Sequence, residues 1–331
     1  MPNLVPITIA CGEYDRTRPI KDGRIQIDGC EVSYLPLGPE ELFFRAFRYA
    51  EFDVAELSFN SYLMQTSRGL CPYIAIPAFV SRHFRHSSIF IRTDRGIRSP
   101  KDLKGKLVGL PEYQQTANVW MRGIFKEEYG IEPAQIRWRN GGQEEPGRDE
   151  RTPLELKNGV ELLPIPAGET LNGMLLQGTL DAVFSARAIS SYVNAAPNIG
   201  LLFPNYHEVE RAYFQRTGIF PIMHLVGIKK SLVERYPWLP GTVYKAFCAA
   251  KRIALSEMRE MAATNVMVPW PELQVQDSIE LMGNDYWRYG VRECAHEIET
   301  LVRYSHDQGL MARELTAEEI FHPSTFETSK V

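Results

Sequence analysis

The chain has 331 residues, of which 44% are hydrophobic and 24% are charged. These proportions are typical of globular proteins and exclude a disordered, collagen-like or coiled-coil chain, while the length is about twice that of one domain. Lysine and arginine total 37 against 41 acidic residues, and this net charge of −4 excludes a nucleic-acid binder with a globally basic surface. No apolar run approaches the roughly 18 residues that a transmembrane helix needs, so neither nucleic acid nor membrane is an expected partner.

The amino terminus predicts a strand rather than a secretory leader. The first basic residue is Arg16, and the apolar run 4–10 before it is short and contains Pro6. A leader would have a basic start, a longer apolar region and a small-residue cleavage site. The cysteines are odd in number and form no Cys-x-x-Cys pair, so neither a disulfide framework nor a thiolate zinc site is indicated, and a cytoplasmic location is predicted. The cysteines are Cys11, Cys30, Cys71, Cys248 and Cys294.

The first 80 residues alternate strand and helix signals. A helix is expected after Gly38-Pro39, because the acidic pair that follows suits a first turn and the next apolar residues have helical spacing. Ser58 is placed to cap a second helix that ends at Gly69. This β-α-β-α-β order predicts a parallel sheet with helices on its faces. The expected strands are 7–11, 31–36, 53–57 and 73–78.

A second α/β unit is predicted from about residue 92, and it begins with the capped turn Ser99-Pro100. Residues 139–153 are polar and are expected to form an exposed loop, and the chain becomes increasingly helical after Pro204. The predicted lobes are 1–91 with 206–331, and 92–205. The helical C-terminal third either covers the first lobe or forms a homo-oligomer interface. The expected elements are strands 107–110, 160–165 and 181–184 and helices 117–129, 170–178, 238–261 and 292–308.

Two segments resemble the type II periplasmic binding proteins. One is the segment 99–110, Ser-Pro-Lys-Asp-Leu-Lys-Gly-Lys-Leu-Val-Gly-Leu, which is similar to the entry into the second lobe of that fold. The other is 178–183, Gly-Thr-Leu-Asp-Ala-Val. The resemblance implies an α/β fold of two lobes joined by two crossovers, with a small anion bound in the cleft between them.

Further motifs together resemble the 4,5-dihydroxyphthalate decarboxylase family, whose members are cytoplasmic and share this fold. The resemblance implies that one carboxylate of a dihydroxylated aromatic dicarboxylate leaves as CO₂, giving protocatechuate. The expected ligand is therefore a small aromatic carboxylate. The motifs are 13–19 (Glu-Tyr-Asp-Arg-Thr-Arg-Pro), 53–58 (Asp-Val-Ala-Glu-Leu-Ser), 82–87 (Arg-His-Phe-Arg-His-Ser), 111–120 (Pro-Glu-Tyr-Gln-Gln-Thr-Ala-Asn-Val-Trp) and 185–187 (Ser-Ala-Arg).

Several arginines follow predicted strands, at the edge where ligands bind in open α/β sheets. Guanidinium groups pair with both oxygens of a carboxylate, so a group of them near one cleft suits a dianionic ligand. The alternative is that these arginines are solvated loop residues. The predicted substrate-binding arginines are Arg16, Arg18, Arg82, Arg85 and Arg187.

Three histidines are candidates for acid–base chemistry, because an ordinary imidazole transfers protons near neutral pH. His83 and His86 could share a helical face and bind a metal ion, but in an extended segment they point to opposite sides. Hydrogen-bonded or exposed structural histidines are the alternative. His224 lies on an apolar strand and is either a core residue or faces the cleft.

Polar residues near two helix starts complete the predicted site. Free backbone N–H groups at a helix N-terminus favour an anion. Thr116 could be a helix cap as well as a ligand, and Glu56 is either a paired structural carboxylate or a cleft acid. Asp15 is placed to orient a histidine or a phenol. The predicted substrate-binding residues of this group are Ser58, Asn60, Tyr113, Gln114, Gln115 and Thr116, and the predicted catalytic residues are Asp15, Glu56, His83, His86 and His224.

The hypothesis is a decarboxylation in which an acid protonates the ring carbon while a base deprotonates the phenol. No cofactor is expected, because no glycine-rich dinucleotide motif follows a strand; a divalent metal ion is the alternative. The alternative function is a non-catalytic binding protein for a small aromatic or other organic anion, because such a protein would have the same sequence motifs for the fold. Exported binding proteins carry a leader or a lipid anchor, so the expected absence of a leader favours the enzyme.

Overall fold

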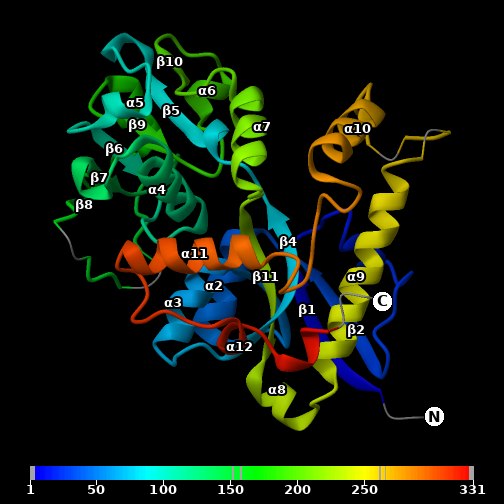
Figure 1. The fold of residues 1–331 in the computed structure, drawn as a ribbon. Helices are drawn as coiled ribbons and strands as arrows, with labels where there is room; N and C mark the ends of the chain where they lie inside the picture. Colours follow the sequence, from blue (N-terminus) through cyan, green and yellow to red (C-terminus); the bar gives the residue numbers. More distant parts are fainter. Residues whose placement is uncertain (1–3, 151–152, 157–158, 261, 265, 328–331) are drawn as a thin grey trace.

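The computed structural model describes residues 4–150, 153–156, 159–260, 262–264 and 266–327. These residues form two β-sheets, each flanked by helices, and the chain crosses between them twice (Figure 1). Each sheet with its helices is called a lobe below. The strands of the first sheet are β1 (Val5–Cys11), β2 (Cys30–Pro36), β3 (Val54–Ser58), β4 (Tyr73–Arg82) and β11 (Ile222–Lys229).

The first sheet has the order β2-β1-β3-β11-β4 and is mixed rather than parallel. β1 pairs in parallel with β2 and β3, as predicted, but β11 lies between β3 and β4 and is antiparallel to both. The reason is the path of the chain. β4 leads out of this sheet, and β11 returns from the second lobe, so β11 runs against β4.

The second sheet has the order β10-β5-β9-β6-β7-β8. β5 already belongs to this sheet, so the chain leaves the first sheet after Arg82, earlier than residue 92. Asn140 ends a strand and Gly142 is buried, so the segment 139–153 is not exposed throughout as expected; residues 151 and 152 lie outside the described residues. The strands are β5 (Ile89–Arg92), β6 (Leu107–Leu110), β7 (Arg137–Asn140), β8 (Leu162–Pro164), β9 (Ala182–Phe184) and β10 (Ile199–Leu201).

The helices begin and end largely at the predicted signals. The second helix has Gly38 at its N-cap and Pro39 in its first turn, and the fourth ends at Gly130, which adopts a φ of 66°. The helices are α1 (Arg18–Lys21), α2 (Pro39–Tyr49), α3 (Phe59–Ser67), α4 (Thr116–Tyr129), α5 (Leu171–Gln177), α6 (Ser190–Val193), α7 (Tyr206–Thr217), α8 (Lys230–Arg235), α9 (Leu239–Glu257), α10 (Pro271–Met282), α11 (Ala295–Asp307) and α12 (Ala317–Ile320).

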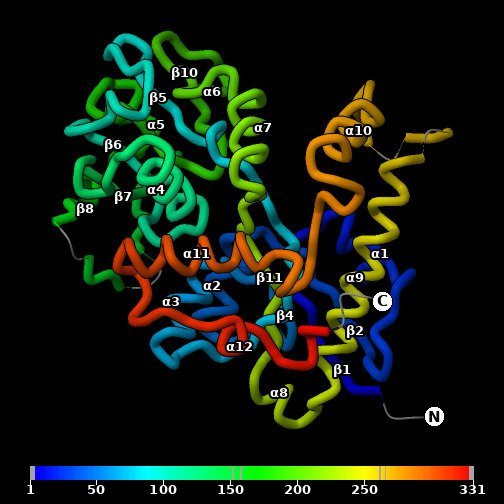
Figure 2. Tube along the Cα trace, viewed as in Figure 1, coloured from blue at the N-terminus to red at the C-terminus, as the bar shows by residue number. Residues whose placement is uncertain are grey.

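The C-terminal third covers both lobes. α9 packs against α1 and β4 of the first lobe, while α11 packs against α3 of the first lobe and α4 of the second (Figure 2). Gly123 of α4 lies against the ring of Tyr304, which leaves no room for a Cβ at that position. Arg122 donates to Gln308 at 2.8 Å across the same contact. α11 therefore ties the second lobe to the first; a homo-oligomer stays a prediction.

Candidate active site

A cavity of about 780 Å³ lies between the lobes. The end of β3, the end of β4, β11 and the start of α2 line it from the first lobe. The first turn of α4 and the loops after β7 and β9 line it from the second lobe. Its lining residues are Tyr14, Pro39, Glu40, Phe43, Ser58, Ser81, Arg85, Pro111, Gln115, Thr116, Ala117, Gly142, Gln143, Glu144, Glu145, Pro146, Arg148, Ser185, Ala186, Arg187, Ala188, Met223 and His224.

His224 lines the cavity and a buried carboxylate from the adjacent strand lies beneath it; we call this pair the floor. Glu56 of β3 is completely buried, and its Oε1 lies 2.6 Å from Nδ1 of His224 on β11. The antiparallel register pairs His224 with Ser58, so Glu56 and His224 are diagonal neighbours on one face of the sheet. Because Nδ1 faces the carboxylate, the Nε2 side of the ring is left for the cavity that the residue lines. The ring of Phe43 meets that imidazole edge-on, with centroids 4.8 Å apart.

Glu56 is held as an anion by several donors. Burial alone would raise its pKa, but hydrogen bonds from His224, the Gly12 N–H and the Tyr14 hydroxyl keep the pKa below its ordinary value. The Gly12 N–H donates to Oε2 at 2.8 Å, and the Cys11 thiol lies 3.4 Å from the same oxygen. Two roles were predicted for Glu56, a paired structural carboxylate or a cleft acid. In the structure it is paired with His224, a histidine that lines the cavity.

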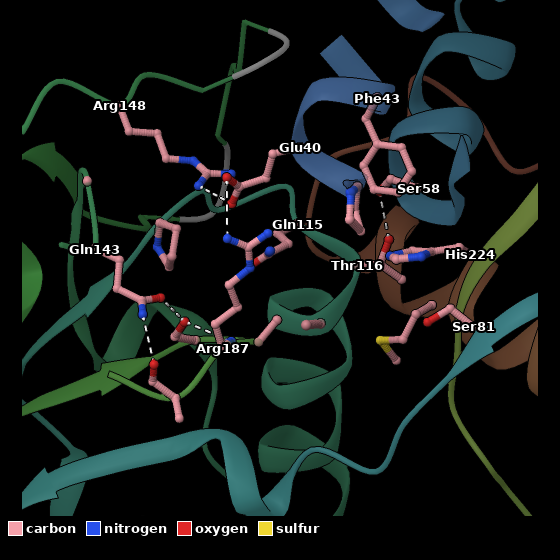
Figure 3. A pocket seen from close by; sticks show the side chains of 18 of the residues that line it. Glu40, Phe43, Ser58, Ser81, Gln115, Thr116, Gln143, Arg148, Arg187 and His224 are labelled. Carbon is pink, nitrogen blue, oxygen red and sulfur yellow. Dashed lines mark hydrogen bonds and ion pairs between the residues drawn. The ribbon is translucent and has the colours of Figure 1, made fainter. Parts of the chain in front are cut away.

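Hydroxyl groups and a helix N-terminus line the wall beside His224 (Figure 3). Thr116 is the first residue of α4, where Gln115 is the N-cap, so Thr116 is not the cap itself. Its Oγ1 lies 3.0 Å from Ser58 Oγ and accepts the backbone N–H of Asn60 at 3.0 Å. The first turn of α4 brings backbone N–H groups and the positive end of the helix dipole to this wall, an arrangement that favours an anion.

Arg85 is the buried cation of the cavity. Its Nε lies 3.2 Å from Met223 Sδ, and its Nη1 makes only long contacts to Ser88 Oγ at 3.5 Å and the Ala186 carbonyl at 3.4 Å. Within the described part of the chain, no carboxylate lies within ion-pair distance of it. Burial lowers the pKa of Arg85 to about 10, so the group stays cationic at neutral pH. A buried guanidinium with weak partners is suited to an incoming carboxylate.

Charged side chains from both lobes meet away from the floor, in what we call the mouth cluster: Glu40, Arg148, Arg187 and Glu112. Glu40 of α2 pairs with Arg148 at 2.7 Å and with Arg187 at 3.6 Å, so first-lobe and second-lobe charges join here (Figure 3). Arg148 also donates to Glu112 at 2.9 Å. The side chain of Arg187 is 61% exposed, in contrast to Arg85.

Three predicted residues near the first strand lie outside the cavity lining. Arg16 is stacked between the rings of Tyr14 and Trp287, at 4.3 and 4.2 Å, and donates to the Val80 carbonyl at 2.7 Å. Asp15 pairs with Arg16 at 2.9 Å. Arg18 is exposed on α1. All three follow β1 as predicted. The side chain of Arg16 packs against Tyr14 with Asp15 paired to it, and that of Arg18 points to solvent.

Three predicted residues of the first crossover also lie elsewhere. Arg82 is buried, pairs with Glu297 of α11 at 3.3 Å and is not among the residues that line the cavity. His83 is exposed, and its Nδ1 contacts the carbonyl of Phe84. His86 is 3% exposed and packs against the rings of Phe203 and Tyr213.

The loop before α4 divides its predicted residues between cavity and core. Gln115 and Thr116 line the cavity, whereas Tyr113 and Gln114 are completely buried and do not. The ring of Tyr113 packs under the guanidinium of Arg122 at 3.5 Å, and Gln114 accepts a hydrogen bond at its carbonyl from the Asn60 side chain at 2.7 Å. These residues support the wall from behind.

Several lining residues were not among the predicted site residues. Phe43 and Glu40 had been assigned only to a helix, although they lie three positions apart and so share one face of α2. Arg148 lies in the loop expected to be exposed, and its place in the cavity depends on partners distant in the sequence. Tyr14 had entered as part of the motif 13–19; it lines the cavity, and its hydroxyl donates to Glu56.

The structure also bears on metal ions and membranes. Among the described residues, no three or more His, Cys, Asp and Glu side chains gather closely enough to hold a metal ion. His83 and His86, the pair considered for a metal, have different surroundings, one exposed and one packed among aromatic rings. No helix in the described ranges is long and apolar enough to cross a bilayer.

Two solved structures that share the fold are ligand-binding proteins. A periplasmic sulfonate-binding protein of Methylobacillus flagellatus is 14% identical with a TM-score of 0.54, over 99% of this chain and 94% of that one. The ligand-binding component of an ABC-type import system of Staphylococcus aureus, with zinc bound, is 8% identical with a TM-score of 0.54, over 97% and 98%. The two-lobed fold with its interlobe cavity thus belongs to the periplasmic-binding-protein class.

Sequence comparison gives the family within that class. No protein-family model matches the chain. It is 45% identical over 325 residues, covering 98% of both chains, to a 4,5-dihydroxyphthalate decarboxylase of Comamonas testosteroni. It is 49% identical over 201 residues to a 4,5-dihydroxyphthalate decarboxylase of Pseudomonas putida, covering 61% of this chain and 78% of that protein. The chain belongs to the 4,5-dihydroxyphthalate decarboxylase family, as its motifs predicted.

Proposed function

We propose that the protein is a carboxy-lyase that converts 4,5-dihydroxyphthalate to protocatechuate and CO₂ at the floor of the interlobe cavity. The observation that carries the proposal is the Glu56–His224 pair, a buried anion 2.6 Å from an imidazole that lines the cavity. The full-length relative supports the substrate, because it is named for that reaction.

The chemistry needs a proton donor next to the ring. In 4,5-dihydroxyphthalate each hydroxyl is para to one carboxylate, so its oxygen can delocalise positive charge when the carbon that bears the carboxylate is protonated. The C–C bond to the carboxylate then breaks, its electron pair returns to the ring, and CO₂ leaves. One proton is consumed and replaces the carboxyl group.

His224 supplies this proton in the proposed mechanism. The Glu56 carboxylate stabilises the imidazolium form and orients the ring so that Nε2–H faces the substrate. After the transfer the imidazole is neutral and takes a new proton from solvent. The floor needs no covalent nucleophile for this step. Asp15, which was predicted to orient a histidine or a phenol, does not line the cavity and has no part in this step.

Positive charge and a helix dipole on the cavity wall hold the remaining carboxylate. Arg85 offers a buried guanidinium, and the first turn of α4, with Gln115 and Thr116, offers a second anion-binding element. Phe43 stands beside His224 and provides an apolar face for the aromatic ring. This arrangement suits a ring with two neighbouring carboxylates.

The test is turnover by the purified protein. Incubation with 4,5-dihydroxyphthalate should give equal amounts of protocatechuate and CO₂, followed by chromatography and gas analysis. Tight binding without any turnover would overturn the proposal in favour of a solute-binding protein.

A parallel incubation with a strong chelator tests the proposal that the reaction needs no metal ion. Turnover should be unchanged after chelation. Loss of turnover that is restored by a divalent ion would contradict this part of the proposal and leave the substrate assignment intact.

A further inference from the structure

Tyr14 bridges the cavity and the buried carboxylate. Its ring lines the cavity, and its hydroxyl donates to Glu56 Oε1 at 2.9 Å, the same oxygen that His224 Nδ1 approaches at 2.6 Å. Cys11 and Gly12 contact the other oxygen, Oε2. Both oxygens of the carboxylate are therefore fixed by donors from the loop after β1.

The position of Tyr14 is itself strongly constrained. A Cβ on Gly12 would lie 2.5 Å from the Tyr14 ring, so only glycine lets the ring close over this turn. The guanidinium of Arg16 lies over the same ring at 4.3 Å and also stacks on Trp287. Arg16, predicted to bind substrate, instead holds Tyr14 from behind.

We propose that Tyr14 is a positioning residue that fixes Glu56, and thereby the tautomer and orientation of His224, for the proton transfer. Its catalytic consequence depends on the proposed function; its effect on the imidazole does not. With the other donors of the pocket committed to Glu56, the carboxylate accepts from Nδ1–H of His224, and Nε2 is presented to the cavity.

The electrostatics agree with this role. Burial and the neighbouring Glu56 charge raise the pKa of Tyr14 well above its ordinary value, so its hydroxyl remains a donor throughout the working range of pH. A neutral hydrogen-bond donor steadies the carboxylate without neutralising it. The negative charge therefore remains available to an imidazolium.

The test is Tyr14→Phe, which removes the hydroxyl and keeps the ring. A hydrogen bond to a charged group implies a fall in kcat of about 10-fold or more, whereas KM should change by less than about 3-fold because Arg85 and α4 are untouched. Loss of this donor raises the pKa of Glu56, so the acid limb of the kcat profile should move to higher pH.

Nitrogen-15 NMR of the histidine rings gives a readout that does not require turnover. The chain has seven histidines, and His224→Gln identifies the His224 signal. In the unmodified protein at a pH where the ring is neutral, Nδ1 should carry the proton. In Tyr14→Phe the His224 signal should shift, because the carboxylate that accepts from Nδ1–H has lost a donor and becomes a stronger acceptor.

Tyr73→Phe is the matched control. It also removes a buried hydroxyl from the first lobe, one that donates to the Phe52 carbonyl at 2.9 Å and lies outside the cavity lining. It should leave kcat, its pH profile and the His224 signal unchanged. If the unmodified protein shows no turnover, the proposed function is contradicted, while the effect of Tyr14 on the His224 imidazole is still tested by NMR. Turnover with unchanged kcat, pH profile and His224 signal in Tyr14→Phe would overturn the role of Tyr14.

Discussion

The cavity floor and the first crossover each hold a histidine, but the partners of the two imidazoles differ. At the floor, His224 has a carboxylate at 2.6 Å and an open side toward the cavity. At the crossover, His86 is packed among aromatic rings, and its nearest carboxylate, Glu210, lies 3.8 Å from Nδ1. Burial lowers the pKa of His86 to about 4, so this imidazole is neutral and inert at physiological pH.

The same contrast separates two arginines of the crossover. Arg82 pairs with the buried Glu297 and donates to the carbonyls of Phe220 and Arg288. Its charge is therefore already compensated within the fold. Arg85 has only weak partners and lines the cavity. A charged side chain is available to a ligand when the fold has not already compensated it.

Removing the negative charge of Glu56 should lower kcat more than any other substitution considered below. Glu56→Gln keeps the shape of the side chain and removes the anion beside His224. Because this anion stabilises the imidazolium, kcat should fall by about 100- to 10,000-fold in steady-state assays with 4,5-dihydroxyphthalate. A variant with kcat near that of the unmodified protein would show that the floor and the crossover do not differ as described.

Arg85 should control binding rather than the chemical step. Arg85→Gln removes the buried cation, and loss of charged hydrogen bonds of about 1.5–3 kcal/mol implies a KM higher by about 10- to 150-fold. The neighbouring Arg82→Lys is the comparison at the other arginine and should leave KM within about 3-fold while lowering the thermal midpoint. Equal effects of the two substitutions on KM would contradict the distinction.

The neutral state of His86 should appear in the pH dependence of stability. Its folded-state pKa of about 4 lies below its ordinary value of 6.5. The unfolded chain therefore binds a proton that the folded chain does not, and the contribution to stability is lost as pH falls from about 6.5 toward about 4. Urea denaturation should show about 2 kcal/mol lost from this source between about pH 7 and about pH 5.

A variant isolates this contribution from other titrating groups. In His86→Leu the loss between these two pH values should be smaller than in the unmodified protein by that amount. The pKa of Glu210 is raised by burial, which acts in the opposite direction, so Glu210→Gln should steepen the loss. Identical pH dependence in His86→Leu and the unmodified protein would show that His86 is not held neutral.

The exposed arginine of the mouth cluster should give the smallest effect on KM. Arg187 pairs with Glu40 at 3.6 Å and is largely exposed, and exposed ion pairs contribute about 0–1 kcal/mol. Arg187→Ala should therefore raise KM by no more than about 5-fold, and added salt should reduce the difference. A rise in KM as large as that expected for Arg85→Gln would indicate that the main anion-binding site lies at the mouth cluster.

The sequence predicted the parts of the fold that depend on local signals. Strands, helix starts and the two-lobed class follow from periodicity, caps and motifs, and Glu56 and His224 were both placed on strands. It did not predict that β11 runs between β3 and β4, because that pairing joins residues far apart in the chain. The Glu56–His224 pair depends on the same register, with 168 positions between them.

The crossover string shows the corresponding limit for side chains. Arg82 and Arg85 are three positions apart and chemically identical, and no local pattern distinguishes them. What separates them is Glu297, which is 215 positions from Arg82 and reaches it through α11. Arg148 and Glu40 meet for the same kind of reason, across the two lobes.

The most direct test of His224 as the proton donor is His224→Gln, measured for binding and turnover in the same preparation. We predict that calorimetry finds a Kd for 4,5-dihydroxyphthalate within about 5-fold of the unmodified protein, because Arg85 and the start of α4 remain, while kcat falls by at least about 100-fold. A variant that keeps more than about a tenth of kcat would contradict the assignment of His224 as the proton donor.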